Sequence, residues 1–235
     1  MERKDAIRGA YRITGGNNFY DGMITCSTLS GKAVCRLVWG MNKAECDNYF
    51  EKALSGIPED FSGKLLEVPV GTGILTMPVY KTMPAADIAC LDYSPDMMGQ
   101  AQEKADRLNL NNITFQKGDV GALHYDDNTF DIVLSLNGFH AFPDKEAAYR
   151  EVFRVLKPGG TFCGCFYVTG EHKRTDWFVR HIYEKAVFFT PPYETVSGLK
   201  NRLDGMYADV DIGNLKSMAW FVCRKEVKPK SDSFE

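Results

Sequence analysis

The residues best suited to binding chemistry stand in the stretch Glu67-Val68-Pro69-Val70-Gly71-Thr72-Gly73 and at Asp92. Gly71 and Gly73 carry no Cβ, so the backbone of a turn at these positions can approach a ligand closely. Asp92 follows Gly73 by nineteen residues. At that spacing a carboxylate accepts hydrogen bonds from ribose hydroxyls in nucleotide-binding α/β sheets. The pattern therefore predicts a site for a ligand that contains a ribose.

Glu67, at the end of the first expected strand, restricts the charge of that ligand. A carboxylate here suits a ligand with an ammonium group, and S-adenosylmethionine carries both an amine and a sulfonium cation. A pyrophosphate cofactor would instead favour a glycine-rich turn with no acid nearby. Thr76 also stands where the dinucleotide fingerprint requires its third glycine, and no lysine follows as in a P-loop. An NAD-dependent oxidoreductase is therefore the less favoured alternative.

Strand and helix patterns alternate from Gly63 onward and would position these residues. Four helices are expected. The first covers 74–83, the second begins after a cap at Ser94, the third runs from a cap at Asp144 to a stop at 157–160, and the fourth lies within about 195–205. This alternation predicts a mainly parallel sheet with helices on both faces. Apolar runs predict its strands at 64–70, 87–91, 112–116, 130–136, 161–168, 208–215 and 218–224.

Four features follow directly after predicted strands: the glycine turn, Asp92, Asp119 and Asn137. Right-handed crossovers place the carboxyl ends of the early parallel strands at one edge of the sheet. Ligands of such sheets bind beyond those ends, near the switch in strand order. We therefore expect the four features to converge on one crevice.

The stretch from about Leu65 to Tyr167 resembles class I S-adenosylmethionine-dependent methyltransferases, most of all the small-molecule branch that includes the ubiquinone and menaquinone C-methyltransferases. The resemblance implies a Rossmann-like, seven-stranded, mainly parallel sheet whose last strand is antiparallel. One departure is Pro69, which replaces the usual first glycine and removes a backbone N–H. The matching segments are 67–73, Leu91-Asp92-Tyr93-Ser94, Gly118-Asp119-Val120, Phe130-Asp131-Ile132-Val133 and 154–160, with a looser upstream match at Phe19-Tyr20-Asp21, Leu29-Ser30 and Trp39.

The resemblance also implies a role for each site residue. The methionine end of the cofactor is assigned to Glu67 and to the turn that contains Pro69, Gly71, Thr72 and Gly73. The adenosine end is assigned to Asp92 on the ribose, Tyr93 or Met97 beside the adenine, Asp119 on its amino group and the Val120 N–H on a ring nitrogen. Asn137 would lie below the sulfonium. Apart from the resemblance, Tyr20 is expected to cover the cofactor. For each acid, the alternative is a helix cap or a turn former.

Catalysis requires little from side chains, because methyl transfer is an in-line displacement that depends mainly on alignment. A general base is needed only where the acceptor must lose a proton. His140, after the fourth strand, is the candidate base; the alternative is that it orders the loop 137–143. The expected activity is methyl transfer to a small apolar or aromatic acceptor. A non-catalytic S-adenosylmethionine-binding protein is the alternative.

Three further regions complete the expected organisation. Residues 1–62 form an N-terminal helical cover within the same domain, residues 63–226 form the core, and 227–235 form a polar tail. The core carries a substrate-cover insertion at about 170–205. Aromatic residues in both covers suit an apolar or aromatic substrate, with ordinary core packing as the alternative; they are Tyr11, Phe19, Tyr20, Trp39, Trp177, Phe178, Tyr183, Phe188 and Phe189. We expect the segment around Phe19-Tyr20 to close over the cofactor, with Gly15 and Gly16 as a hinge.

Charge and hydropathy narrow the class of partner. The net charge is −3 and the one compact basic cluster, His172-Lys173-Arg174, is short, so a small-molecule substrate is favoured over nucleic acid. The sequence contains no run of about 18 apolar residues, so stable membrane insertion is not expected. The N-terminal residues 1–5 are not followed by the apolar core of a signal peptide, so a cytoplasmic protein is expected. The oligomeric state stays open.

Seven cysteines, an odd number, favour reduced thiols over a disulfide framework. Cys26, Cys35 and Cys46 could form a thiol cluster for a metalloid substrate. The favoured interpretation is that they are small buried apolar residues, and no metal site is predicted.

Overall fold

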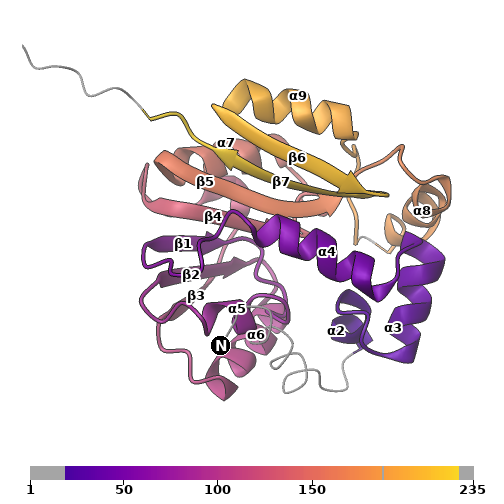
Figure 1. Ribbon diagram of the computed structural model, residues 1–235, viewed down its shortest axis with the longest axis horizontal. Helices are drawn as coiled ribbons and strands as arrows, with labels where there is room; N and C mark the ends of the chain where they lie inside the picture. Colours follow the sequence, from indigo (N-terminus) through magenta and orange to yellow (C-terminus); the bar gives the residue numbers. More distant parts are fainter. Residues whose placement is uncertain (1–18, 187, 228–235) are drawn as a thin grey trace, which may run out of the picture.

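Short apolar runs form a seven-stranded sheet in the order β3-β2-β1-β4-β5-β7-β6. The computed structural model describes residues 19–186 and 188–227 (Figure 1). Neighbouring strands from β3 to β5 pair in parallel, whereas β7 runs antiparallel to both β5 and β6. The predicted fold class is confirmed, including its antiparallel last strand. The strands are β1 Lys64–Glu67, β2 Asp87–Asp92, β3 Ile113–Lys117, β4 Phe130–Leu136, β5 Leu156–Tyr167, β6 Asp209–Leu215 and β7 Met218–Arg224.

Both faces of the sheet are buried, because successive side chains of each central strand enter different apolar clusters. Leu65 packs in the cluster with α4 (Lys43–Leu54), α5 (Met77–Tyr80) and α6 (Pro95–Arg107). Leu66 packs in the opposite cluster with α7 (Lys145–Val155) and α9 (Val196–Met206). Figure 1 shows α9 and α4 on opposite sides of the sheet.

The predicted helix caps at Ser94 and Asp144 are confirmed. Ser94 accepts a hydrogen bond from the Met97 N–H at 3.4 Å, and Asp144 accepts one from the Ala147 N–H at 2.9 Å. Helix α7 ends at Val155, as the proline and glycines after it predict. The chain then enters β5 earlier than expected, because Leu156 already pairs with Phe130.

Two predicted elements are shorter in the structure than in the sequence pattern. Strand β1 ends at Glu67 rather than Val70, since Pro69 has no N–H to donate to a neighbouring strand. The helix expected at 74–83 covers only Met77–Tyr80, because the residues before it form the turn around Gly71 and Gly73. Both differences lie next to the predicted site, where the backbone leaves regular structure.

The N-terminal residues form short helices that meet the segment after β5. These are α2 (Phe19–Ile24), α3 (Leu29–Val34) and the π-helical turn η1 (Cys35–Trp39). The later segment contains α8 (Lys173–Phe178) and the π-helical turn η3 (Val179–Tyr183). Thr175 donates a hydrogen bond to the Val38 carbonyl at 2.6 Å, so the two segments are joined. Figure 1 shows α2, α3 and α8 grouped at one end of the molecule.

Some predicted features lie outside the described residues. They include Tyr11, the Gly15-Gly16 hinge and nearly all of the polar tail. The division into cover, core and tail stays a prediction. Across the described ranges, every helix is too short or too polar to cross a bilayer.

Candidate functional site

A cavity of about 70 Å³ lies beyond the carboxyl end of β1. Strand β1 pairs with β2 on one side and β4 on the other, so the cavity stands at the switch in strand order where such sheets bind ligands. Six predicted site residues are brought together around it: Glu67, Pro69, Gly71, Thr72, Gly73 and Asn137. The remaining lining residues are Ile24, Val70, Ile74, Leu75, Thr76 and Leu136.

The two turn glycines serve different purposes. Both have positive φ, +56° at Gly71 and +67° at Gly73, a conformation that side chains with a Cβ rarely adopt. A Cβ at Gly73 would stand 2.9 Å from the Met77 side chain, whereas one at Gly71 would meet nothing within 4 Å. Gly73 therefore allows close packing of α5, and Gly71 leaves open space beside the backbone.

Glu67 is a buried carboxyl group at the end of β1, with 1% of its surface exposed. The Tyr80 hydroxyl donates a hydrogen bond to its Oε2 at 2.8 Å. Burial raises the pKa of Glu67 to about 8, although the Tyr80 hydrogen bond opposes the shift. With these partners the group is protonated at neutral pH. A cation beside it would favour the carboxylate.

Asp92 joins the glycine turn to helix α6. Its Oδ2 accepts the Gly71 N–H at 2.7 Å, and its Oδ1 accepts the Ser94 N–H at 2.8 Å. Burial raises the pKa of Asp92, and the backbone hydrogen bonds oppose that shift. Each carboxylate oxygen has more than one acceptor site. Asp92 can therefore hold the turn and also accept hydrogen bonds from ligand hydroxyls.

All five residues assigned to the adenosine end, Asp92 included, stand outside the cavity lining. Tyr93 is 76% exposed, and Met97 is half-buried in the first turn of α6. Asp119 is exposed and accepts the Gly121 N–H at 2.8 Å, which caps a short 3₁₀ helix. Val120 buries its side chain in the core. Their assignment to the cofactor stays a prediction, and the cap at Asp119 matches the alternative interpretation of that acid.

Asn137 has an unusual backbone for a residue other than glycine. Its φ is +57°, and its N–H donates to the Cys165 carbonyl at 2.7 Å. This left-handed conformation costs a residue other than glycine of order 1–3 kcal/mol, and such residues cluster at functional sites. Asn137 lines the cavity directly after β4, where its side chain amide can contact a ligand.

His140 is buried and does not line the cavity. Its Nδ1 accepts the Tyr167 N–H at 3.2 Å, and its ring stacks on Phe189 at 3.9 Å. Burial, with a smaller effect of Lys145, lowers the pKa of His140 to about 3. A neutral, hydrogen-bonded imidazole of this kind matches the interpretation in which His140 orders the loop. The base assignment gains no support from the geometry.

Sequence reasoning missed the buried carboxylate of Asp21, which joins α2 both to the glycine turn and to α6. Asp21 Oδ1 accepts a hydrogen bond from the Thr72 hydroxyl at 2.6 Å, and its Oδ2 lies 3.0 Å from Lys104 Nζ. Both charged side chains are buried, 4% exposed at Asp21 and 8% at Lys104. Asp21, Thr72 and Lys104 lie far apart in the sequence, so no local pattern predicts that they meet. Tyr20 lies in the same helix, but its side chain is outside the described structure.

Aromatic residues of the two predicted covers meet in one cluster. Trp39 packs on Tyr167, Tyr183 and Phe189, with ring centroids 6.1–6.2 Å apart. Trp177 and Phe188, by contrast, are largely exposed. A larger hollow of about 410 Å³ lies beside the cluster at Arg180, Glu184 and Tyr193. We favour the smaller cavity as the cofactor site, since it alone contains the buried acid and the glycine turn.

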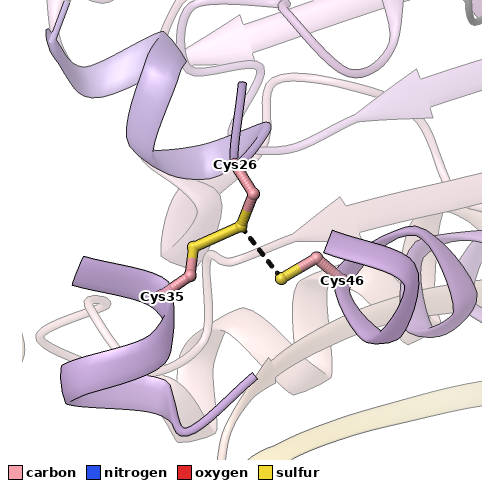
Figure 2. A group of neighbouring side chains, drawn as sticks. All are labelled: Cys26, Cys35 and Cys46. Atoms are coloured by element: carbon pink, nitrogen blue, oxygen red, sulfur yellow. Dashed lines mark hydrogen bonds between the residues drawn. A yellow bond between two sulfur atoms is a disulfide. The ribbon is translucent and has the colours of Figure 1, made fainter. Parts of the chain in front are cut away.

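The prediction that every cysteine is reduced is wrong for two of them. Cys26 and Cys35 form a disulfide, and Cys46 Sγ lies 3.1 Å from Cys26 Sγ (Figure 2). The packing of three N-terminal segments brings these thiols together, which a count of cysteines does not reveal. The prediction that all three are buried is confirmed.

Comparison with known proteins identifies what the central part of the chain resembles. Residues 65–160 match the family model described as a methyltransferase domain. The chain is 36% identical over 97 residues to demethylmenaquinone methyltransferase of Thermus thermophilus, a match that covers 41% of this chain and 44% of that protein. It is 30% identical over 133 residues to 2-methyl-6-phytyl-1,4-hydroquinone methyltransferase 1 of Oryza sativa subsp. japonica, covering 57% and 38%. The predicted resemblance to class I methyltransferases is confirmed.

A solved structure resembles the fold over more of the chain. Phosphoethanolamine N-methyltransferase 2 of Haemonchus contortus, in complex with S-adenosyl-L-methionine, has a TM-score of 0.64 at 14% identity. The match covers 90% of this chain and 61% of that one. The matches to the two sequence relatives span less than half of the length of either relative.

Proposed function

We propose that the protein is a methyltransferase that transfers a methyl group from S-adenosylmethionine to a small apolar or aromatic acceptor. One observation carries the proposal: a buried carboxyl at Glu67 stands beside the open Gly71 turn, inside the stretch that matches a methyltransferase domain. A cationic amino-acid group favours the carboxylate of that residue, whereas a pyrophosphate gains no favourable charge interaction from it. The NAD-dependent alternative is correspondingly disfavoured.

The residues of the site would bind and orient the cofactor. S-adenosylmethionine supplies an electrophilic methyl group and a neutral thioether leaving group. Glu67 would hold the amine, Asp92 would accept from the ribose hydroxyls, and Asn137 would contact the ligand beside the sulfur. Pro69 and Leu136 line the same cavity and would exclude water from the transfer site. Alignment of acceptor and methyl group then accounts for most of the catalysis.

The aromatic cluster supports an apolar or aromatic acceptor. Trp39 comes from the N-terminal cover, and Tyr183 and Phe189 come from the segment after β5. Aromatic walls suit ring-shaped substrates, and the hydroquinone named for the rice relative belongs to that class. The small-molecule acceptor and the cytoplasmic location predicted from the sequence are parts of this proposal.

Cofactor binding is expected to move the N-terminal cover. The cavity of about 70 Å³ is smaller than the roughly 300 Å³ at the lower end of ligand pockets. Helix α2 carries both Asp21, which contacts the turn, and Ile24, which lines the cavity. Outward movement of α2 would enlarge the cavity without disturbing the sheet. Hydrogen exchange in residues 19–24 should therefore change when S-adenosylhomocysteine is added, and unchanged exchange would contradict this movement.

The proposal is tested by calorimetry with S-adenosylmethionine and NAD in parallel, followed by assays of methyl transfer to hydroquinones and phenols. Binding of the first cofactor alone, with turnover, is the expected result. Binding of NAD instead would overturn the proposal. Tight S-adenosylmethionine binding without turnover across broad acceptor panels would favour the non-catalytic alternative. A structure with S-adenosylhomocysteine and any co-purified ligand would identify the acceptor.

A further inference from the structure

Three cysteines of the N-terminal helices converge at a point that the proposed methyltransferase function does not use. Cys26 follows α2, Cys35 begins η1, and Cys46 lies in α4 (Figure 2). All three side chains are buried, and their Sγ atoms lie within 4.8 Å of one another. They are spaced nine and eleven residues apart, unlike the short paired spacings of zinc fingers. Tertiary packing alone assembles this cluster.

The backbone is irregular at two of the three cysteines. Cys26 has a φ of +49°, in the left-handed region that residues other than glycine rarely adopt. Cys35 opens the π-helical turn η1, and π-helical turns occur frequently at functional sites. Such conformations persist only where the surrounding structure enforces them. Here they accompany a disulfide between Cys26 and Cys35 and a contact of 3.1 Å between the Sγ atoms of Cys26 and Cys46.

The surroundings of the cluster do not favour negative charge. The cluster is buried, and the nearby charges are already paired: Lys43 with Asp47 at 2.9 Å and Lys216 with Glu45 at 3.3 Å. Among the described residues, no histidine or carboxylate joins the group. Three thiolates around a monovalent or divalent cation would leave a net negative charge in this buried place, whereas three thiolates around a trivalent ion are neutral.

We propose that the reduced forms of Cys26, Cys35 and Cys46 bind a trivalent, thiophilic metalloid, with arsenic(III) as its model. Sulfur ligands select soft ions of this kind. Three sulfurs bonded at about 2.3 Å to one ion stand no more than about 4 Å apart, taking the length of a metal–thiolate bond. The observed limit of 4.8 Å means that small side chain rotations suffice. The ion would tie α2, η1 and α4 together.

The chemistry requires the disulfide to be reduced first. A phosphine attacks the Cys26–Cys35 bond and, with one water molecule, leaves two thiols and a phosphine oxide. Arsenous acid then exchanges its three hydroxyl groups for three thiols. Three As–O bonds break, three As–S bonds form, and the three thiol protons leave with the hydroxyls as three water molecules. Arsenic stays trivalent throughout, so this step needs no oxidant.

The experiment titrates arsenite into the full chain, reduced with a phosphine and without S-adenosylmethionine. We expect one arsenic per chain, a rise in ultraviolet arsenic–sulfur absorbance, and protection of three of the seven cysteines from alkylation. Cys26→Ser, Cys35→Ser and Cys46→Ser should each weaken binding at least tenfold. Cys223→Ala is the matched control, because Cys223 is buried in the opposite core cluster; it should bind as the unsubstituted chain does.

Four outcomes would overturn the site. They are no binding, unchanged affinity in Cys46→Ser, protection of other cysteines, and stoichiometric Zn²⁺ binding with no response to arsenite. Circular dichroism and thermal melting identify a variant that fails to fold, and alkylation mapping of the unsubstituted chain then decides the question. Since S-adenosylmethionine is absent, the result is independent of the proposed methyltransferase activity.

Discussion

The edge of the sheet and the N-terminal cover contribute to the site in different ways. At the sheet edge, Glu67 and Asp92 end the paired strands β1 and β2, and Gly71, in the turn after β1, donates its N–H to Asp92. In the cover, Asp21 of α2 contacts the Thr72 hydroxyl of the turn and the Lys104 ammonium group of α6. The sheet edge is therefore rigid and encoded locally. The cover depends on a few long-range polar contacts, which suits a part that moves.

The largest expected effect comes from breaking the polar contact that docks the cover. Lys104→Met leaves Asp21 buried without its cationic partner, and loss of one partner of a buried pair costs about 3–5 kcal/mol. Hydrogen exchange should rise strongly in α2, while the strands stay protected. The matched control is the double variant Asp21→Asn/Lys104→Met, which removes both charges and should recover much of the protection. Equal loss of protection in the sheet would show that the two regions are not separable.

The next effect concerns the rigid region. Asp92→Ala should weaken S-adenosylmethionine binding by roughly 1.5–3 kcal/mol, the range for hydrogen bonds to a charged group. Asp87→Ala, at the exposed start of the same strand, is the control and should bind normally. Calorimetry measures both affinities, and unchanged affinity in Asp92→Ala would remove this residue from the site.

A smaller effect is expected at Glu67, as a pH dependence of the affinity for S-adenosylmethionine. Its raised pKa of about 8 means that the free protein is protonated there at lower pH, whereas a bound ammonium group needs the carboxylate. Binding then releases a proton, and affinity should rise up to about tenfold per pH unit between roughly pH 6 and 7.5. Calorimetry in buffers of different ionisation enthalpy measures the release. Glu67→Gln should bind more weakly and release no proton; a pH-independent affinity in the unsubstituted chain would refute the assignment.

The smallest effect is expected at His140. Because its pKa is about 3, it does not titrate near neutral pH and should not contribute to the pH dependence of the turnover rate. His140→Asn should change the turnover rate only a few-fold and keep the shape of the pH–rate curve between about pH 5 and 8. Loss of an ionisation from that curve in the variant would restore His140 as a general base.

The sequence by itself determined the sheet, the caps and the turn. The strands at 130–136 and 218–224 have the predicted bounds, and Ser94 and Asp144 cap their helices. These features depend on side chain periodicity and on hydrogen bonds within a few residues, so a local pattern carries them. Six of the assigned cofactor residues also meet at one cavity, because parallel strands bring their carboxyl ends to one edge.

Only the tertiary structure decided how the cover meets the core and which thiols meet one another. Thr72 finds Asp21 across fifty-one residues, and Cys26, Cys35 and Cys46 converge from three separate segments. It also buries His140 against Phe189 and outside the cavity lining. Contacts of this kind depend on the packing of distant elements, and burial depends on the whole surrounding core. Neither the long-range contacts nor the burial can be predicted from a repeating pattern in the sequence.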